Sequence, residues 1–370
     1  MKMNAAVLWA ANSDWSVEEV ELDPPGDREV LVSFEATGMC HSDHHFRTGD
    51  TPVALPIIGG HEGAGVVVEV GPGVRDLKVG DHVVTSFLPV CGQCRWCSTG
   101  HQNLCDMGAL IMMGTQVDGT YRRHARGQDI GVTSLLGCFA QYGTVHETSL
   151  VKIDDDIPLN RACLLGCGVT TGWGSAVNTA KVSPGDTVVV IGFGGIGSGA
   201  VQGARLAGAE KIVVIDIAEH KRDKAFQFGA THFATSVAEG LELVGQITHG
   251  VMADSALITV GLAEGPMIND ALMMVRKGGA AVLTAIANAF DMTPTLPMAM
   301  FTFFQKRLLG SLYGEANMRA DIPRLLSLYR EGKLLLDETV TTEYKLADIN
   351  VGYDDMLAGR NIRGVIVHDH

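Results

Sequence analysis

The sequence has no long block of basic or acidic residues, no low-complexity segment and no internal repeat. Its formal net charge is −14, because 28 lysines and arginines face 42 aspartates and glutamates. This balance argues against nucleic acid or an anionic membrane as a partner. The modest excess of carboxylates is explained most simply by a solvated surface.

The first residues, MKMNAAVLWAANSDW, lack both the basic n-region and the apolar stretch of a secretory signal peptide. One uncharged run, Thr187–Ala204, is long enough to suggest a membrane helix, but six glycines interrupt it. We therefore expect a cytosolic protein with no membrane partner.

The hydrophobic pattern changes near Pro184. Before it, EVLVSFEATGMC, GAGVVVEVGPGV and GDHVVTSFLPV are short and rich in valine, which predicts β-strands. After it, predicted strands (TVVVIGF, KIVVIDI, SALITV, AAVLTAI) alternate with predicted helices (GGIGSGAVQGARLAGA, EHKRDKAFQFGA, INDALMMVRKGG). The chain ends in the strand-like IRGVIVHD. At 370 residues it is too long for one ordinary core, so we predict an α/β protein in which a doubly wound parallel sheet is inserted into a β-rich domain.

Four cysteines lie within the fifteen residues CGQCRWCSTGHQNLC: Cys91, Cys94, Cys97 and Cys105. The spacing lets four thiolates converge on one tetrahedral ion. Zinc suits thiolate sulfur, and four sulfurs leave no open position for a substrate. The pattern therefore predicts a structural zinc site. Iron–sulfur ligation is the alternative, and a disulfide pair is disfavoured in a cytosolic protein.

The motif GFGGIG directly follows a predicted strand and opens a predicted helix. Its residues are Gly192, Gly194, Gly195, Ile196 and Gly197. The match alone is weak among 45 glycines, but Asp216 ends the next predicted strand about twenty residues downstream. Glycines let a pyrophosphate approach the helix N-terminus, and Asp216 would accept hydrogen bonds from ribose hydroxyls. NAD is favoured over NADP, because Ile217-Ala218 offers no arginine for a 2′-phosphate. The alternative is a glycine-rich helix start without a ligand.

Outside the cluster, the cysteines are Cys40, Cys138, Cys163 and Cys167. Cys40 lies in GMCHSDHH and Cys167 in LLGCGVTTGWG, while His61 and Glu62 lie in GGHEGAG. A lone cysteine or histidine is more often a packed core residue than a ligand. Spacing cannot unite Cys40, His61 and Cys167, which are 21 and 106 residues apart.

Six motifs occur in the order GMCHSD, GGHEGAG, CGQCRWC, GCGVTTG, GFGGIG and VVID. In this order they resemble the zinc-dependent medium-chain alcohol dehydrogenases, from about Val30 to the C-terminus. The resemblance implies a GroES-like catalytic domain over 1–168 and 314–370, and an NAD-binding Rossmann domain over 169–313. It also implies two zinc ions per chain and oxidation of alcohols to aldehydes by hydride transfer to NAD.

The resemblance assigns the catalytic zinc to Cys40, His61 and Cys167, with the fourth position left for an alcohol oxygen. Glu62 resembles the family's carboxylate close to the metal, and Asp43 the carboxylate that orients the ligating imidazole.

Ser42 and His45 match the family's proton relay, which runs from the hydroxyl through the nicotinamide ribose to the imidazole. A simple surface histidine is the alternative for His45 and our expectation for His44. Cofactor contacts are expected from the following residues: His41, Thr171, Lys221 and Arg363. Solvated surface charge is the alternative for the three charged members of that set. Cys138 and Cys163 match no motif and are expected to be buried free thiols.

The segment Met107–Cys138 is longer than the link expected in common short-chain alcohol enzymes. Together with CHSDHHFRTGD it looks closest to the nicotinoprotein alcohol dehydrogenases of actinobacteria. Those enzymes keep NAD(H) tightly bound and pass reducing equivalents to an external carrier, with nitrosodimethylaniline as an artificial acceptor. The alternatives are an ordinary exchanging dehydrogenase, including the thiol-adduct formaldehyde oxidisers, and a non-catalytic zinc and NAD binder acting as a redox sensor.

The apolar stretch LPMAMFTFF, residues 296–304, favours a dimer interface or core over a substrate wall. Family habit suggests a homo-oligomer joined through the Rossmann sheets.

Overall fold

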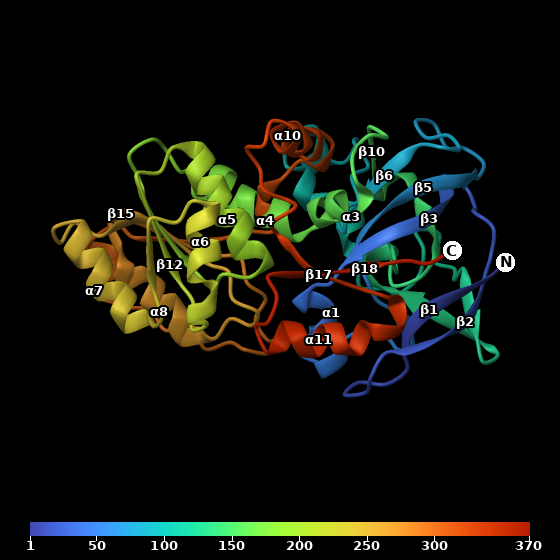
Figure 1. Ribbon diagram of the computed structural model, residues 1–370, viewed down its shortest axis with the longest axis horizontal. Coiled ribbons are helices and arrows are strands. Elements are labelled where there is room, and N and C mark those ends of the chain that lie inside the picture. The colour runs from blue at the N-terminus through green and yellow to red at the C-terminus, as the bar shows by residue number, and fades with distance from the viewer. The chain divides into compact units, whose positions relative to one another are not determined.

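A computed structural model describes residues 1–370, and the chain divides into two compact units (Figure 1). The first unit comprises Met1–Cys167, Asn317–Gly332 and Leu336–His370. The second comprises Gly168–Ala316 and Lys333–Leu335. Both ends of the chain therefore belong to the first unit. The predicted domains, 1–168 with 314–370 and 169–313, stay a prediction.

β-Structure dominates the first unit. Its strands are β1 Lys2–Leu8, β2 Ser16–Leu22, β3 Glu29–Gly38, β4 Ile57–Ile58, β5 Glu62–Val70, β6 His82–Thr85, β7 Arg123–Ala125, β8 Gln128–Val132, β9 Tyr142–His146, β10 Leu150–Ile153, β17 Val340–Tyr344 and β18 Arg363–Val367. Its helices are α1 His41–Thr48, α2 Arg95–Ser98, α3 Leu159–Ala162, α10 Met318–Arg330 and α11 Ile349–Leu357. Strands β1, β2, β7, β8 and β4 close a barrel, and β3 is central in a seven-stranded sheet.

Strand β3 positions the site, because it pairs with β5, β9 and β18 and is buried along nearly its whole length. The consecutive apolar side chains of Val30, Leu31 and Val32, followed by Phe34, suit a strand that is covered on both faces. The end of β3 delivers Cys40 to the start of α1, and β5 begins at Glu62 beside it, paired with Gly38.

The second unit is a six-stranded parallel sheet in the order β13-β12-β11-β14-β15-β16. Its strands are β11 Thr187–Ile191, β12 Lys211–Ile215, β13 His232–Ala234, β14 Ala253–Ile258, β15 Val275–Leu283 and β16 Arg307–Gly310. Its helices are α4 Gly168–Gly174, α5 Gly195–Ala207, α6 Arg222–Phe228, α7 Val237–Ile247, α8 Gly265–Met274 and α9 Met298–Phe303. The order reverses between β11 and β14, which is the switch point where doubly wound sheets bind dinucleotides. The predicted α/β fold class is confirmed.

The predicted helix over residues 268–279, INDALMMVRKGG, is wrong at its C-terminal end. Helix α8 ends at Met274, and Val275 begins strand β15. Val275 is β-branched, and Gly278 has a φ of +71°, which a helix cannot contain. Parallel pairing of β15 with β14 therefore decides the conformation of VRKGG.

The uncharged run Thr187–Ala204 forms strand β11 and most of α5, and no helix is both long enough and apolar enough to cross a membrane. Glycines in α4 and α5 allow these two helices to pack closely. A Cβ at Gly172 of α4 would stand 1.9 Å from the Ile196 carbonyl oxygen, and a Cβ at Gly199 would stand 2.6 Å from the Val169 carbonyl oxygen. Helices α4 and α5 therefore meet backbone to backbone.

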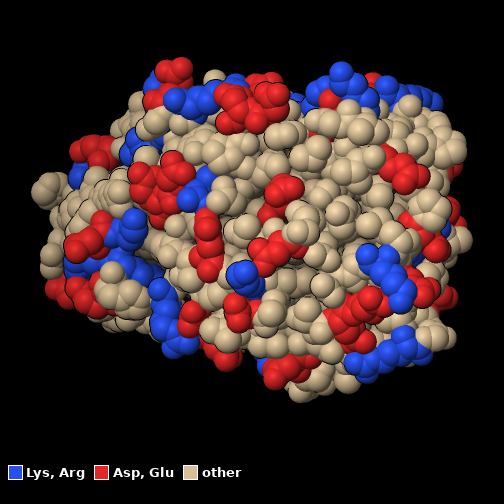
Figure 2. Space-filling model, turned by 45° about the vertical axis from the view of Figure 1, so that its right-hand side comes forward, with Lys and Arg blue, Asp and Glu red and all other residues tan.

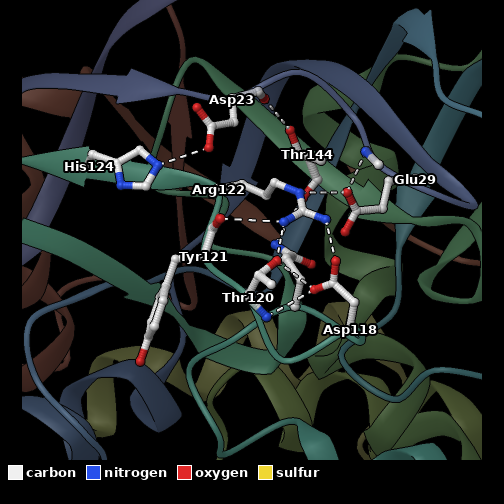
Figure 3. Close-up of polar contacts among 10 residues, drawn as sticks. Asp23, Glu29, Asp118, Thr120, Tyr121, Arg122, His124 and Thr144 are labelled. Carbon is white, nitrogen blue, oxygen red and sulfur yellow. Dashed lines mark hydrogen bonds and ion pairs between the residues drawn. The ribbon is translucent and has the colours of Figure 1, made fainter.

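The segment Met107–Cys138 supplies two of the five barrel strands, β7 and β8. Arg122 fixes the chain just before β7. The Arg122 guanidinium lies 2.9 Å from Glu29 and 2.6 Å from Asp118 (Figure 3). His124 stands beside it, 2.9 Å from Asp23. The long segment is thus a structural part of the barrel wall.

Charged side chains of both signs are interspersed on the face shown in Figure 2, and no broad basic field appears there. This agrees with the absence of charge blocks in the sequence.

We expect Gly172→Ala to lower the melting temperature, because the added methyl overlaps the Ile196 carbonyl oxygen and forces α4 and α5 apart. Such overpacking costs about 1–3 kcal/mol. Gly245→Ala in α7 is the matched control, since its Cβ would meet no atom within 4 Å. Helix propensity predicts an unchanged or higher melting temperature for this control. Equal behaviour of the two variants in thermal unfolding would contradict the packing argument.

His124 should give stability a pH dependence. Its hydrogen bond to Asp23 is the main cause that raises the His124 pKa, and Asp129, 2.8 Å away, also raises it. The stabilisation is complete below the unfolded pKa of about 6.5 and is lost as the pH rises through the raised folded value. The stability advantage of wild type over His124→Gln should therefore be larger at pH 6 than at pH 8.5, and below about 1 kcal/mol. His220→Gln controls for loss of an exposed histidine, and an advantage that grows with pH would refute the assignment.

Candidate active site

The first unit buries a group of potential metal ligands drawn from three separate stretches of chain. Cys40, His61, Glu62 and Cys167 each offer one ligand atom, and these atoms all lie within 4.8 Å of one another. All four side chains are more than nine-tenths buried. The structure thus brings together residues that no spacing rule could unite.

Local backbone geometry explains how each residue reaches the site. Cys40 occupies the N-cap of α1 in an extended conformation, where β3 gives way to the helix. His61 follows Gly60, whose φ is +87° and whose Cβ would stand 2.6 Å from the Phe139 nitrogen. A side chain at Gly60 would therefore displace the loop that carries His61. Cys167 follows a short helical turn over Cys163–Gly166.

Asp43 orients the imidazole of His61. One oxygen of its fully buried carboxylate accepts a hydrogen bond from the Gly60 amide at 2.8 Å, and the other lies 3.0 Å from His61 Nδ1. Although burial lowers the pKa of His61, the charges of Asp43 and Cys40 raise it well above its usual range. The Nδ1 contact leaves Nε2 as the nitrogen for a metal.

The two cysteines differ in their electrostatics. The hydrogen bond with Cys167 is the main cause that holds the Cys40 pKa well below its usual range, and the neighbouring His61 acts in the same direction. A thiolate, a second thiol and an imidazole form a donor set that suits zinc, and three such donors leave one coordination position open.

Glu62 forms a buried ion pair with Arg363, through Oε2 and Nη2. Burial raises the pKa of Glu62, and Arg363 opposes that rise. The contact of Arg363 with cofactor phosphates stays a prediction, and the structure places its guanidinium against this carboxylate. It therefore neutralises a charge that would otherwise be buried beside two cysteines.

Helix α1 carries three histidines with different surroundings. His45 is 3% exposed, with Nδ1 3.3 Å from Asp50 Oδ2, so it is not a surface histidine. His44, expected at the surface, is half-buried and stacks on the Tyr353 ring. Burial lowers the pKa of His41 to about 4, so His41 can offer a hydrogen bond at neutral pH but not a full charge. Ser42 Oγ lies 3.5 Å from Cys40 Sγ.

The second unit forms the dinucleotide-type turn. Gly192 has a φ of +94°, and a Cβ there would stand 2.9 Å from the Val260 backbone. Gly194 caps α5, which begins with Gly195, Ile196 and Gly197, and a Cβ at Gly194 would meet no atom within 4 Å. The amides at the start of α5 and the space above Gly194 suit a phosphate approaching the helix N-terminus.

Asp216 directly follows β12 and lies at the same edge of the sheet as the turn Gly192–Gly197. Its Oδ2 accepts a hydrogen bond from the Phe193 amide at 2.7 Å, and its Oδ1 accepts one from Ala218 at 2.9 Å. Lys221 Nζ lies 3.2 Å from Oδ2. Each carboxylate oxygen has two lone pairs, so Oδ1, which accepts one hydrogen bond here, can still accept one from a ribose hydroxyl. Thr171 is 5% exposed and its hydroxyl has no partner, which suits a ligand at this unit.

The four clustered cysteines converge as predicted. The Sγ atoms of Cys91, Cys94, Cys97 and Cys105 all lie within 4.8 Å of one another. Backbone amides of Cys97 and Asp106 lower the pKa of Cys94 to about 6, which favours a thiolate. None of the eight cysteines forms a disulfide. Cys138 and Cys163 are buried free thiols, and burial raises the pKa of both.

Comparisons with known proteins identify the family to which the chain belongs. Residues 26–155 match the family described as Alcohol dehydrogenase GroES-like domain, and residues 195–331 match Zinc-binding dehydrogenase. The chain is 51% identical to Alcohol dehydrogenase B of Mycobacterium tuberculosis over 368 residues, covering 99% of this chain and 98% of that protein. The chain belongs to the zinc-dependent alcohol dehydrogenase family. Membership makes it an oxidoreductase that acts on alcohols with zinc and NAD(H).

Two further similarities refine its place in the family. The chain is 49% identical to the NDMA-dependent alcohol dehydrogenase of Amycolatopsis methanolica over 368 residues, covering 100% of this chain and 99% of that protein. The crystal structure of an alcohol dehydrogenase zinc-binding domain protein from Burkholderia ambifaria is similar with a TM-score of 0.94 and 30% identity, covering 100% of both chains.

Sequence reasoning missed two partners in this alcohol dehydrogenase. Asp50 lies five residues beyond His45, past the helix-ending Gly49, where helical spacing no longer predicts contact. The Glu62–Arg363 pair joins residues 301 apart. Only an intact β-sheet brings β18 and β3 together, so no local signal could have found this pair.

We expect Asp43→Asn to weaken metal binding about 10–100-fold, since the neutral amide orients the His61 imidazole less firmly. Chelator competition, with zinc per chain measured at each step, reports the change. Asp14→Asn is the control, because Asp14 is exposed and paired with Arg47. Unchanged zinc retention in Asp43→Asn would show that the contact has no such role.

Proposed function

We propose that this alcohol dehydrogenase keeps NAD(H) bound through turnover and passes reducing equivalents to an external carrier. The observation that carries the proposal is its 49% identity, over the whole chain, to an NDMA-dependent alcohol dehydrogenase. The long barrel segment and the unpartnered hydroxyl of Thr171 support it.

Two zinc ions per chain fit the two donor sets. Cys91, Cys94, Cys97 and Cys105 offer a closed set of four sulfurs, whose role is structural. Cys40, His61 and Cys167 offer three donors, and a Cys2His set is the one known for catalytic zinc in alcohol dehydrogenases. Zinc held there supplies a Lewis acid that acidifies an alcohol, and NAD supplies the hydride acceptor.

The protein groups around the catalytic donors have separate tasks. Asp43 fixes the tautomer of His61, and Arg363 compensates the charge of Glu62. Glu62 lies among the donor atoms and is placed to assist ligand exchange.

The alcohol proton leaves through helix α1. Ser42 would accept the proton at Oγ while releasing its own, and His45 in the same helix would take up the proton that is passed on. His45 Nδ1 lies 3.3 Å from Asp50 Oδ2, and Asp50 is one quarter exposed, so this pair connects α1 with solvent.

The dinucleotide is assigned to the second unit. The turn Gly192–Gly197 receives the pyrophosphate, while Asp216 binds the adenosine ribose with Lys221 beside it. The carboxylate selects NAD over NADP. His41 can add a hydrogen bond to the phosphates.

A second copy of the chain is the proposed partner of residues 286–304. Phe290, Met292, Met298 and Phe303 are at least 74% exposed, so LPMAMFTFF does not form the core of this chain. Apolar exposure of this kind marks an interface.

Protein purified without added nucleotide should carry about one NAD(H) per chain. Gel filtration, denaturation and an absorption spectrum of the released small molecules measure this directly. Alcohol oxidation should proceed with nitrosodimethylaniline and no free NAD. An empty protein that turns over only with free NAD would overturn the proposal in favour of an ordinary exchanging dehydrogenase.

Cys40→Ala should lower alcohol oxidation at least about 100-fold, because a Lewis acid contributes several kcal/mol to the rate. Cys138→Ala is the matched control, a buried thiol outside the donor set. Initial rates with a primary alcohol compare the two. Full activity in Cys40→Ala would mean that the chemistry lies elsewhere.

A further inference from the structure

A network of hydroxyl groups, most of them buried, lies in the second unit. Ser175 Oγ donates to the Thr171 carbonyl at 2.7 Å and accepts from Thr284 Oγ1 at 3.0 Å. Ser311 Oγ lies 3.1 Å from Ser175 Oγ and 2.8 Å from Thr179 Oγ1. Ser175, Thr179 and Ser311 are each less than a tenth exposed. These five residues, Thr171, Ser175, Thr179, Thr284 and Ser311, are called the hydroxyl cluster below.

The hydroxyl cluster lies at the ligand-binding edge of the sheet. Thr284 directly follows β15 and Ser311 directly follows β16, so both stand at the carboxyl ends of parallel strands. Ligands of doubly wound sheets bind outside these ends. Ser175 and Thr179 are the first and last residues of a single π-helical turn that follows α4. Such a distortion is often found at functional sites.

Geometry assigns the cluster to one half of a dinucleotide. The phosphate-type turn follows β11, and Asp216, the ribose carboxylate, follows β12 on one side of it. A dinucleotide that spans the switch point must extend its other half across the opposite side, over β14, β15 and β16. That half is the nicotinamide end, where Thr284 and Ser311 lie.

One member of the cluster is left unsatisfied. The Thr171 hydroxyl is 95% buried, the complement of its 5% exposure, and has no hydrogen-bond partner, while its carbonyl is already used by Ser175. A buried hydroxyl without a partner favours any ligand that pairs with it. The Asn178 amide adds a further tie, donating to the Gly314 carbonyl at 2.9 Å in the turn after β16.

We propose that the hydroxyl cluster retains the nicotinamide end of NAD(H). Directional hydrogen bonds lock the ends of β15 and β16 against the Thr171 turn, so the binding-competent backbone exists before the cofactor arrives. A preorganised site loses less conformational freedom on binding and releases its ligand more slowly. Its members are positioning residues. The inference rests on the proposed function, and it explains how that function keeps its cofactor.

The test measures exchange of bound nucleotide against excess radiolabelled NAD in purified holoenzyme. Ser311→Ala and Thr284→Val should exchange about tenfold faster than wild type, a factor that corresponds to about 1.4 kcal/mol. Thr284→Ser, which keeps the hydroxyl, should restore slow exchange. Ser255→Ala is the matched control, a buried hydroxyl in β14, one strand away and near its amino end. It should exchange at the wild-type rate.

Each outcome has a distinct meaning. Wild type that carries no nucleotide would overturn the proposed function, whatever the variants do. Wild type that carries nucleotide, with Ser311→Ala and Thr284→Val folded and exchanging at its rate, would overturn the role of the hydroxyl cluster alone. Faster exchange in Ser255→Ala as well, or no rescue by Thr284→Ser, would also overturn it, because general loosening of the sheet would then account for the effect.

Discussion

Two thiols, an imidazole and a carboxylate buried within 4.8 Å of one another form the constraint on which the structure depends. Two thiolates and a carboxylate at this separation would repel one another, and burial makes that repulsion costly. A metal cation relieves it. Without a bound cation, Arg363 compensates the charge of Glu62, and Asp43 pairs with His61. Much of the first unit serves this arrangement. The start of α1 delivers Cys40 and Asp43, β5 delivers Glu62 and β18 delivers Arg363, while β3 pairs with both of these strands.

The two groups of potential metal ligands are brought together in different ways. Cys91–Cys105 is a local loop, in which backbone amides donate to neighbouring sulfurs and the chain needs no distant support. The other cluster is assembled from residues far apart, and its geometry exists only when the sheet is complete. A closed local site suits structural stability. An assembled site with an open position suits chemistry.

The sequence predicted those features that local physics controls. Buried strands such as TVVVI, the turn at Gly192 and the sulfur cluster follow from hydrophobic runs, backbone freedom and ligand spacing. The end of α8 was mispredicted, because the parallel pairing of β15 overrides the helical pattern of VRKGG. The ion pair of Arg363 with Glu62 was not predicted, because it depends on the β3–β18 pairing, and the contact of Arg363 with the cofactor stays a prediction. The proposed zinc donors Cys40, His61 and Cys167 were reached only through family resemblance, as no spacing unites them.

Zinc K-edge X-ray absorption tests the central claim, that a second zinc binds at the assembled site. A closed cluster with four sulfurs and an assembled site with two give a mean of three sulfur ligands per zinc, (4 + 2)/2, at two zinc ions per chain. The account predicts about three sulfurs together with a nitrogen or oxygen shell. Four sulfurs per zinc, with one zinc per chain, would show that only the closed cluster holds metal and would contradict it.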